Sequence, residues 1–151
     1  MICIRNVTKN DANLLQNLAN SCKPLDVHTI YTYWVLCNYF NNSCYILEID
    51  TKPIGFITAV QSSKILIWQI GILPEYRGNG YSLKLIDAVI SNINDTEDIR
   101  VTIDKNNSES NGAFKRYADL NDYEMRAIDS LKLKGIDTEE DEIIYNIFKK
   151  E

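Results

Sequence analysis

The 151-residue sequence contains no long hydrophobic run. Its longest apolar stretches, such as Ile65–Trp68 and Ile70–Leu73, are far shorter than the roughly 18 residues that a membrane-spanning helix needs. Met1 is followed by Ile-Cys-Ile-Arg and then by a polar segment, without the basic and apolar regions of a secretory signal. We therefore expect a cytoplasmic protein that does not associate with a membrane.

Residues that could bind a metal are also scarce. His28 is the single histidine, and the four cysteines (Cys3, Cys22, Cys37 and Cys44) form no Cys-x-x-Cys pair. A zinc site normally combines such residues at short spacings, so we expect no metal. The cysteines are expected to be buried free thiols.

The charge balance excludes a general nucleic-acid-binding role. Sixteen basic residues against twenty-one acidic residues give a net charge of −5, whereas nucleic-acid binding normally requires the opposite sign. Carboxylates are concentrated at Asp137–Glu142. This run is typical of a solvated loop, but it could also attract a cationic substrate.

The chain length and the hydrophobic pattern predict one α+β domain spanning residues 1–151, because such domains commonly contain about 100–200 residues. Apolar residues with a period of two indicate strands, and those with a helical period indicate helices. The predicted strands are Ile2–Val7, Cys44–Ile49, Pro53–Val60, Lys64–Ile72, Ile99–Ile103, a weak strand at Glu124–Leu131, and Ile143–Phe148. The predicted helices are Ala12–Asn20, the nearly all-apolar Thr29–Phe40, Tyr81–Ile93 and Ser108–Ala118.

The most informative segment follows the strand Lys64–Ile72. The strand ends before Pro74, and a loop with Arg77, Gly78 and Gly80 leads directly into an amphipathic helix. Backbone N–H groups at such a helix start attract anions, and glycines allow a close approach, so the loop suits a pyrophosphate. It lacks the third glycine of a dinucleotide fingerprint and the Gly-Lys-Ser/Thr of a P-loop.

This loop resembles the acyl-CoA signature of the GNAT N-acetyltransferases, Gln/Arg-x-x-Gly-x-Gly/Ala. Arg77, Gly80 and Ser82 stand at its defining positions, with Ser82 replacing the usual Gly or Ala. The segment Asn107-x-x-Ser110-x-x-x-Phe114 is similar to a second family pattern. The resemblance implies a mostly antiparallel, twisted sheet of six to seven strands flanked by about four helices. It also implies acetyl-CoA as co-substrate, bound by the following residues: Ile70, Gly71, Ile72, Arg77, Gly78, Asn79, Gly80, Tyr81, Ser82, Asn107 and Phe114.

Within that family, three segments resemble the enzymes that acetylate L-2,4-diaminobutyrate in ectoine synthesis. They are Leu25–Tyr33, Ile67–Gly71 and Asp141–Tyr145. Two departures are His28, where that group usually has Asn, and Glu139, where a His is expected. The resemblance implies a small-molecule amine substrate and a homodimer.

The resemblance also suggests three chemical roles. Glu142 would hold the amine and accept its proton, although it could be an ordinary surface carboxylate. The backbone N–H of Ile70 would stabilise the oxyanion. Tyr117 could protonate the departing thiolate, because Phe114 replaces the usual Tyr, or Tyr117 could serve only in packing.

Substrate recognition would fall to Asp26, which can pair with an ammonium group, and to Tyr31 and Trp68, which can enclose the carbon chain. Two alternatives stay open: Asp26 could only cap the second helix, and Trp68, as an aromatic residue of a central strand, could belong to the core. Arg5, Arg100 and Arg126 are all candidates for the substrate carboxylate. An N-acetyltransferase for another small amine or for a protein or peptide amine, and a non-catalytic acyl-CoA-binding module, remain alternatives. The aromatic helix Thr29–Phe40 argues against the peptide groove, because it would lie where that groove must open.

Overall fold

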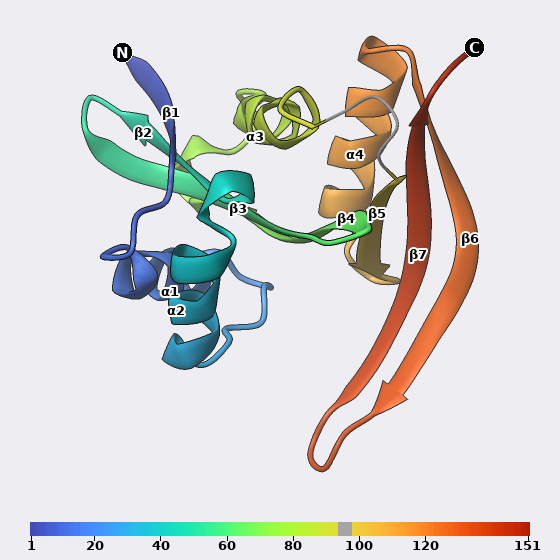
Figure 1. The fold of residues 1–151 in the computed structure, drawn as a ribbon, viewed down its shortest axis with the longest axis horizontal. Coiled ribbons are helices and arrows are strands. Elements are labelled where there is room, and N and C mark those ends of the chain that lie inside the picture. The colour runs from blue at the N-terminus through green and yellow to red at the C-terminus, as the bar shows by residue number, and fades with distance from the viewer. Residues whose placement is uncertain (94–97) are drawn as a thin grey trace.

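The computed structural model of the protein describes residues 1–93 and 98–151. Its seven strands form one sheet in the order β1-β2-β3-β4-β5-β7-β6 (Figure 1). The strands are β1 (Ile2–Asn6), β2 (Tyr45–Ile49), β3 (Lys52–Gln61), β4 (Lys64–Ile72), β5 (Asp98–Asp104), β6 (Tyr123–Lys134) and β7 (Glu139–Lys149). The helices are α1 (Ala12–Ser21), α2 (Ile30–Tyr39), α3 (Tyr81–Ile90) and α4 (Ser108–Leu120), with short 3₁₀ turns at Asn41–Ser43 and Pro74–Tyr76. The predicted element order and fold class are confirmed.

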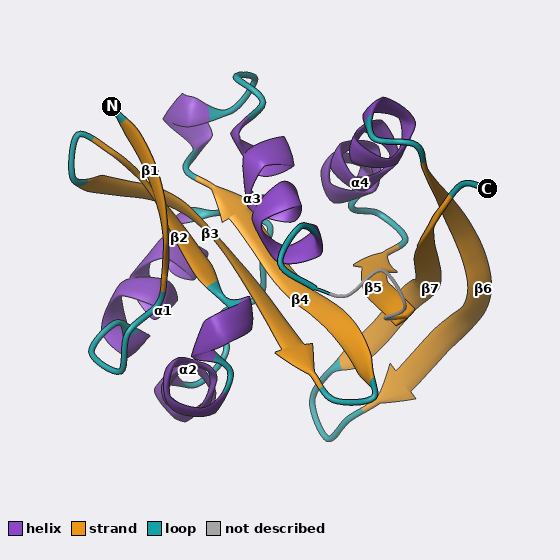
Figure 2. Cartoon of the chain, turned by 45° about the horizontal axis from the view of Figure 1, so that its top comes forward, coloured by secondary structure: helices purple, strands orange, loops and turns teal. Residues whose placement is uncertain are grey.

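Helices cover both faces of the sheet. α1 and α2 lie on one face and α3 and α4 on the other, as Figures 1 and 2 show. Side chains alternate across each strand, so β3 contributes Phe56 to the core under α1 and α2 and Ile57 to the core under α3 and α4. The sheet therefore separates two hydrophobic cores.

One strand pair departs from the antiparallel pattern. β4 and β5 run parallel, and their pairing extends only from Lys64↔Asp98 to Ile67↔Val101. Beyond Ile67 the two strands diverge (Figure 2). Among the described residues, the second half of β4 therefore has no paired strand on its β5 side, so the sheet opens between these two strands.

The C-terminal hairpin is longer than predicted. β6 and β7 pair from Tyr123↔Lys149 to Lys134↔Glu139, and the hairpin extends well beyond the rest of the sheet (Figure 1). The weak strand predicted at Glu124–Leu131 is thus the core of a longer one. The acidic run was predicted to be a loop, but Glu139–Glu142 belong to β7.

One expectation about burial is wrong. Cys3 is exposed, whereas Cys22, Cys37 and Cys44 are buried, and all four are free thiols. The apolar helix α2 is fully buried only along the line of Tyr33, Leu36 and Cys37. Four of its other apolar side chains are exposed: Ile30, Tyr31, Trp34 and Tyr39. None of the helices in the described ranges is long and apolar enough to cross a membrane.

Candidate functional site

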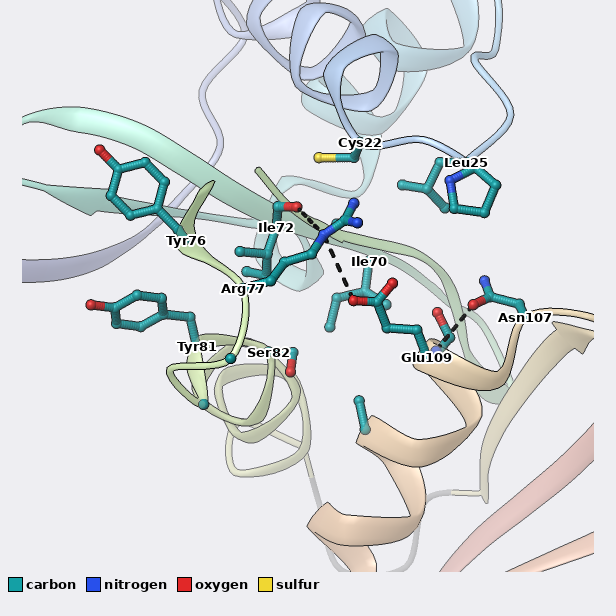
Figure 3. Close-up of a pocket in the computed structure, with 16 residues that line it drawn as sticks. Cys22, Leu25, Ile70, Ile72, Tyr76, Arg77, Tyr81, Ser82, Asn107 and Glu109 are labelled. Atoms are coloured by element: carbon teal, nitrogen blue, oxygen red, sulfur yellow. Dashed lines mark hydrogen bonds and ion pairs between the residues drawn. The ribbon is translucent and has the colours of Figure 1, made fainter. Parts of the chain in front are cut away.

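A first cavity of about 100 Å³ lies where the end of β4, the loop before α3 and the start of α4 meet the segment after α1 (Figure 3). Most of the residues predicted to bind acyl-CoA line it: Ile70, Gly71, Ile72, Arg77, Gly78, Gly80, Tyr81, Ser82 and Asn107. Asn79 does not, because its side-chain amide donates back to the carbonyl of Tyr76 at 3.0 Å. Phe114 is buried and lines a second, adjoining cavity.

The loop before α3 has the backbone geometry of an anion site. Gly78 and Gly80 have φ angles of +85° and +78°, a region that other residues rarely adopt. Gly80 is the N-cap residue immediately before α3, and no side chain among the described residues caps this helix. The first N–H groups of α3, like those of any helix, have no intrahelical acceptor, and with the positive end of the helix dipole they favour an anion.

Arg77 lies across this first cavity rather than pointing to solvent (Figure 3). Its Nε donates to the carbonyl of Ile72 at 3.0 Å, and one terminal nitrogen donates to the carbonyl of Lys23, also at 3.0 Å. Its Nε is also 3.7 Å from a carboxylate oxygen of Glu109. A guanidinium has five N–H donors, so these two bonds leave donors for a phosphate.

Asn107 has a structural role and also faces the cavities. Its Oδ1 accepts a hydrogen bond from the backbone N–H of Ser110 at 3.1 Å and so caps α4. Asn107 and Ser110 line both cavities. The cap thus places the start of α4 at the junction between them.

Gly71 permits the close approach that shapes the first cavity. A Cβ atom at Gly71 would lie 2.9 Å from Cδ1 of Leu25 and 3.0 Å from Sγ of Cys22. The Cys22 thiol lines the cavity, but burial raises its pKa to about 11, so at neutral pH it is a thiol rather than a nucleophilic thiolate. Burial likewise raises the pKa of Cys37 to about 11. Neither cysteine is suited to form an acyl-enzyme.

A second cavity of about 580 Å³, called here the acceptor cavity, lies in the opening between β4 and β5. Its walls come from β4, β5, the start of α4, the segment between α1 and α2, and the β6–β7 hairpin. It shares Ile70 and Asn107 with the first cavity, so the two are continuous in their lining. A ligand in one could therefore meet a ligand in the other beside the unpaired half of β4.

A β-bulge places Trp68 in this cavity. Thr58 pairs with Gln69 and Ala59 pairs with Ile67, which leaves Trp68 as the extra residue of β4. Trp68 is 38% exposed and lines the acceptor cavity. The bulge thus turns an aromatic side chain of a central strand out of the hydrophobic core.

A chain of hydrogen bonds joins β4 to α2 and to the segment before α2. The hydroxyl of Tyr33 donates to Oε1 of Gln69 at 3.0 Å, and Nε2 of Gln69 donates to the carbonyl of Asp26 at 2.7 Å. The N–H of Gln69 is itself bonded to the hydroxyl of Thr58 at 3.1 Å. We assigned no role to Gln69 or Tyr33 from the sequence. A polar Gln within a strand of mainly apolar residues was the available signal.

Four carboxylates from three parts of the chain line the acceptor cavity: Asp26, Asp104, Glu140 and Glu142. No Lys or Arg is found among the described residues that line it. Glu140 and Glu142 lie two positions apart on β7 and so share a face, whereas Asp141 between them lies 3.4 Å from Lys105. Part of the acidic run therefore forms a wall of the acceptor cavity.

The surroundings of Glu142 shift the pKa of its carboxyl group. Burial raises its pKa above the ordinary value, and the negative charges of Glu140, Asp104 and Asp26 raise it further. Asp104 is its direct cross-strand neighbour on β5. A carboxylate with a raised pKa is a stronger proton acceptor, as a general base requires.

Asp26 lines the acceptor cavity and does not cap α2. That helix is capped by Thr29, whose hydroxyl accepts the N–H of Thr32 at 3.3 Å. The Asp26 side chain is therefore not required for the helix start. The structure brings it together with Trp68 and Glu142, as the substrate-binding prediction requires.

Two predicted site residues lie elsewhere. Tyr31 is 68% exposed, stacks on Trp34 with a centroid separation of 5.7 Å, and lines neither cavity. Tyr117 is buried, and its hydroxyl donates to Asp87 of α3 at 2.9 Å. Burial raises the pKa of the phenol, and the hydrogen bond to Asp87 raises it further. Tyr117 also lines neither cavity, so it is not positioned to protonate a leaving group. Tyr117 instead joins α4 to α3.

The three candidate arginines are likewise outside both linings. Arg5 pairs with Asp11 at 2.8 Å, Arg100 with Asp98 at 2.8 Å, and Arg126 with Glu124 at 3.2 Å. Within residues 1–93 and 98–151, no group of three His, Cys, Asp or Glu side chains is arranged to hold a metal ion.

Comparison with known proteins shows which family and which enzymes the chain resembles. Residues 12–118 match the model of the acetyltransferase (GNAT) family. The L-2,4-diaminobutyric acid acetyltransferase of Shouchella clausii is 32% identical over 117 residues, which are 74% of this chain and 65% of that enzyme. The enzyme of the same name from Halomonas elongata is 30% identical over 140 residues, 85% of this chain and 73% of its own. The chain thus spans about two thirds of the length of these relatives.

A solved structure is similar over nearly the whole chain. Diaminobutyrate acetyltransferase EctA from Paenibacillus lautus, in complex with L-2,4-diaminobutyric acid and coenzyme A, has a TM-score of 0.85 and 22% sequence identity. The match covers 98% of this chain and 95% of that one. The protein therefore belongs to the acetyltransferase (GNAT) family.

Proposed function

We propose that the protein transfers the acetyl group of acetyl-CoA to an amine of L-2,4-diaminobutyrate. The observation that carries this proposal is the acceptor cavity, which presents four carboxylates and adjoins the anion site at the start of α3. A diamino acid brings two ammonium groups, and CoA brings a pyrophosphate. The anion site at the start of α3 suits the pyrophosphate, and the carboxylates of the acceptor cavity suit the ammonium groups. The names of the relatives support the same substrate pair.

The reaction is direct transfer between the two cavities. The neutral amine nitrogen attacks the thioester carbonyl carbon, the carbon–sulfur bond breaks, and the thiolate of CoA leaves with the bonding electrons. The amine proton passes to Glu142, whose raised pKa suits it to accept that proton. A thiol with a pKa of about 8.5 leaves readily as its thiolate, so the reaction does not need Tyr117 as an acid.

The unpaired half of β4 supplies the remaining groups. Ile70 lines both cavities and lies beyond the last β4–β5 pair, so we assign its backbone N–H to the developing oxyanion. Asp26 binds an ammonium group, and Trp68 covers the carbon chain. Arg77 and the N–H groups from Gly78 to Ser82 hold the pyrophosphate, while Gly71, Ile72, Asn107 and Phe114 border the rest of CoA.

The test is a thiol-release assay with acetyl-CoA and one amine at a time: L-2,4-diaminobutyrate, ornithine, lysine or a peptide amine. We expect the highest kcat/KM with L-2,4-diaminobutyrate. Asp26→Asn should lower that value about ten- to a hundredfold, because it removes a charged hydrogen bond worth about 1.5–3 kcal/mol. A higher kcat/KM with another amine would refute the substrate assignment.

Glu142→Gln should also lower kcat, because an amide cannot take the proton. Glu139→Gln is its matched control, since it removes the same charge from the same strand at an exposed position outside both cavities. Parental rates in both Asp26→Asn and Glu142→Gln would refute the site.

We further propose that residues 1–151 form one domain that assembles as a homodimer in the cytoplasm. This proposal is supported by exposed apolar side chains on α2 and on the hairpin, which a second copy of the chain would cover. They include Tyr31, Trp34, Leu133 and Ile136. Four free thiols suit a reducing compartment. Sedimentation should give twice the chain mass of 17.4 kDa. A 17.4 kDa species at micromolar concentration would refute the dimer.

A further inference from the structure

The acceptor cavity poses a recognition problem for an amino-acid substrate. Its four carboxylates suit ammonium groups, yet the same charge repels the carboxylate that 2,4-diaminobutyrate also carries. The arginines suggested by the sequence lie outside the cavity and are paired with acidic residues. Because no Lys or Arg is found among the described residues that line the cavity, another group there must bind the substrate carboxylate.

His28 is the one side chain among the described lining residues that can carry a positive charge or present an imidazole N–H. Its ring lies 4.8 Å from the ring of Trp68, centroid to centroid, and 5.9 Å from that of Tyr33. Its backbone is held at both polar groups: the N–H donates to the Tyr33 hydroxyl at 3.4 Å, and the carbonyl accepts from Gln16 at 3.2 Å. The imidazole is thus placed by its surroundings before a ligand arrives.

The ring itself makes no hydrogen bond within the part of the chain that the structure describes. Its Nε2 is buried and has no partner, an arrangement that costs free energy unless something satisfies it. By contrast, the nearby side-chain polar groups of Tyr33 and Gln69 all have hydrogen-bond partners. An unpaired imidazole beside a binding cavity is therefore an available donor for a ligand.

Burial and two neighbouring carboxylates act in opposite directions on the protonation of His28. Burial lowers the pKa of its imidazole, and the carboxylates of Asp26 and Glu140 oppose that shift. A neutral imidazole still has one N–H donor, and unlike a guanidinium it does not neutralise the carboxylates that bind the ammonium groups. It can contact a carboxylate while the cavity stays selective for cations.

We propose that His28 recognises the carboxylate of the amino-acid acceptor through an imidazole N–H and so separates amino acids from plain diamines. This assignment rests on the proposed function and deepens it. Asp26, Glu140 and Glu142 would bind the ammonium groups of the substrate. His28, beside Trp68, would bind its carboxylate.

The test compares L-2,4-diaminobutyrate with 1,3-diaminopropane, which is the same molecule without its carboxylate. His28→Phe keeps an aromatic ring against Trp68 and removes both nitrogens. We expect it to lower kcat/KM for L-2,4-diaminobutyrate about tenfold or more and to leave 1,3-diaminopropane within about twofold. His28→Asn retains an N–H donor and should restore most of the lost preference. An unchanged KM for acetyl-CoA and an unchanged circular dichroism spectrum would show that each variant is folded.

Equal losses on both amines would overturn the assignment, because they would show that the ring serves the fold or the ammonium end. An unchanged ratio in His28→Phe would also overturn it, as would a wild-type preference for 1,3-diaminopropane. A preference for ornithine would refute the proposed substrate alone. In that case, His28 is tested by comparing kcat/KM for ornithine with kcat/KM for 1,4-diaminobutane, which is ornithine without its carboxylate. His28→Phe should again lower only the value for the amino acid, and equal losses on both amines would again overturn the assignment.

Discussion

Replacing Gly80 with alanine tests the anion site at the start of α3 with the least possible perturbation. Gly80 has a φ of +78°, and a Cβ built there meets no atom within 4 Å. The methyl group of Gly80→Ala therefore fits without a clash, and its folding cost is the left-handed backbone strain of about 1–2 kcal/mol. For a chain of this size, that corresponds to a fall in Tm of roughly 2–8 °C.

The effect on acetyl-CoA should be larger than this loss of stability. If the substituted residue keeps the positive φ, its methyl group stands in the lining of the first cavity; if φ relaxes, the loop N–H groups turn away from the anion. Either outcome removes at least one hydrogen bond to a charged phosphate, worth about 1.5–3 kcal/mol. We expect KM for acetyl-CoA to rise about ten- to a hundredfold at saturating amine, with kcat changed much less.

Gly112→Ala is the matched control. A Cβ there also meets no atom within 4 Å, but Gly112 lies inside α4 and lines neither cavity. Alanine in a helix interior should stabilise the fold by up to about 1 kcal/mol and leave KM for acetyl-CoA unchanged. A folded Gly80→Ala protein with the parental KM would refute the placement of the pyrophosphate.

Two further predictions follow from the pKa shifts and contacts. Tyr117→Phe should keep the parental kcat and lose about 1 kcal/mol of stability, because it removes only the hydrogen bond to the exposed Asp87. A large fall in kcat would instead indicate that Tyr117 protonates the leaving group. Because the charge of Glu140 raises the pKa of Glu142, Glu140→Gln should lower that pKa and move the acidic limb of the kcat/KM–pH profile to lower pH. A shift of that limb to higher pH, or none, would contradict Glu142 as the proton acceptor.

The parts of the site that the sequence could predict are those built from one continuous segment. Arg77, Gly80 and Ser82 belong to a single strand–loop–helix unit, so their spacing determines their placement in the first cavity. The same holds for the cap formed by Asn107 and Ser110. The hydrophobic pattern likewise predicted the order of the seven strands and four helices, because most of them bury apolar residues at a regular spacing.

The acceptor cavity was harder to predict because it combines segments far apart in the chain. The bulge at Trp68 depends on how β4 pairs with β3, which the strand's own residues do not reveal. The acidic run resembles a solvated loop until its pairing with β5 and β6 makes it a strand with two different faces. Tyr31 was misplaced for a related reason: helical spacing shows that α2 is apolar on every side, but not which side packs on the sheet.

The division of the two cavities between different parts of the chain bears on how such a protein could change its substrate. The β6–β7 hairpin contributes Leu133, Glu140 and Glu142 to the acceptor cavity and nothing to the first one. Substitutions in the hairpin can therefore alter the charge and size of the acceptor cavity while the lining of the first cavity stays intact. Under the proposed function, selection for a new amine can act on the hairpin without changing the strands and loops assigned to acetyl-CoA.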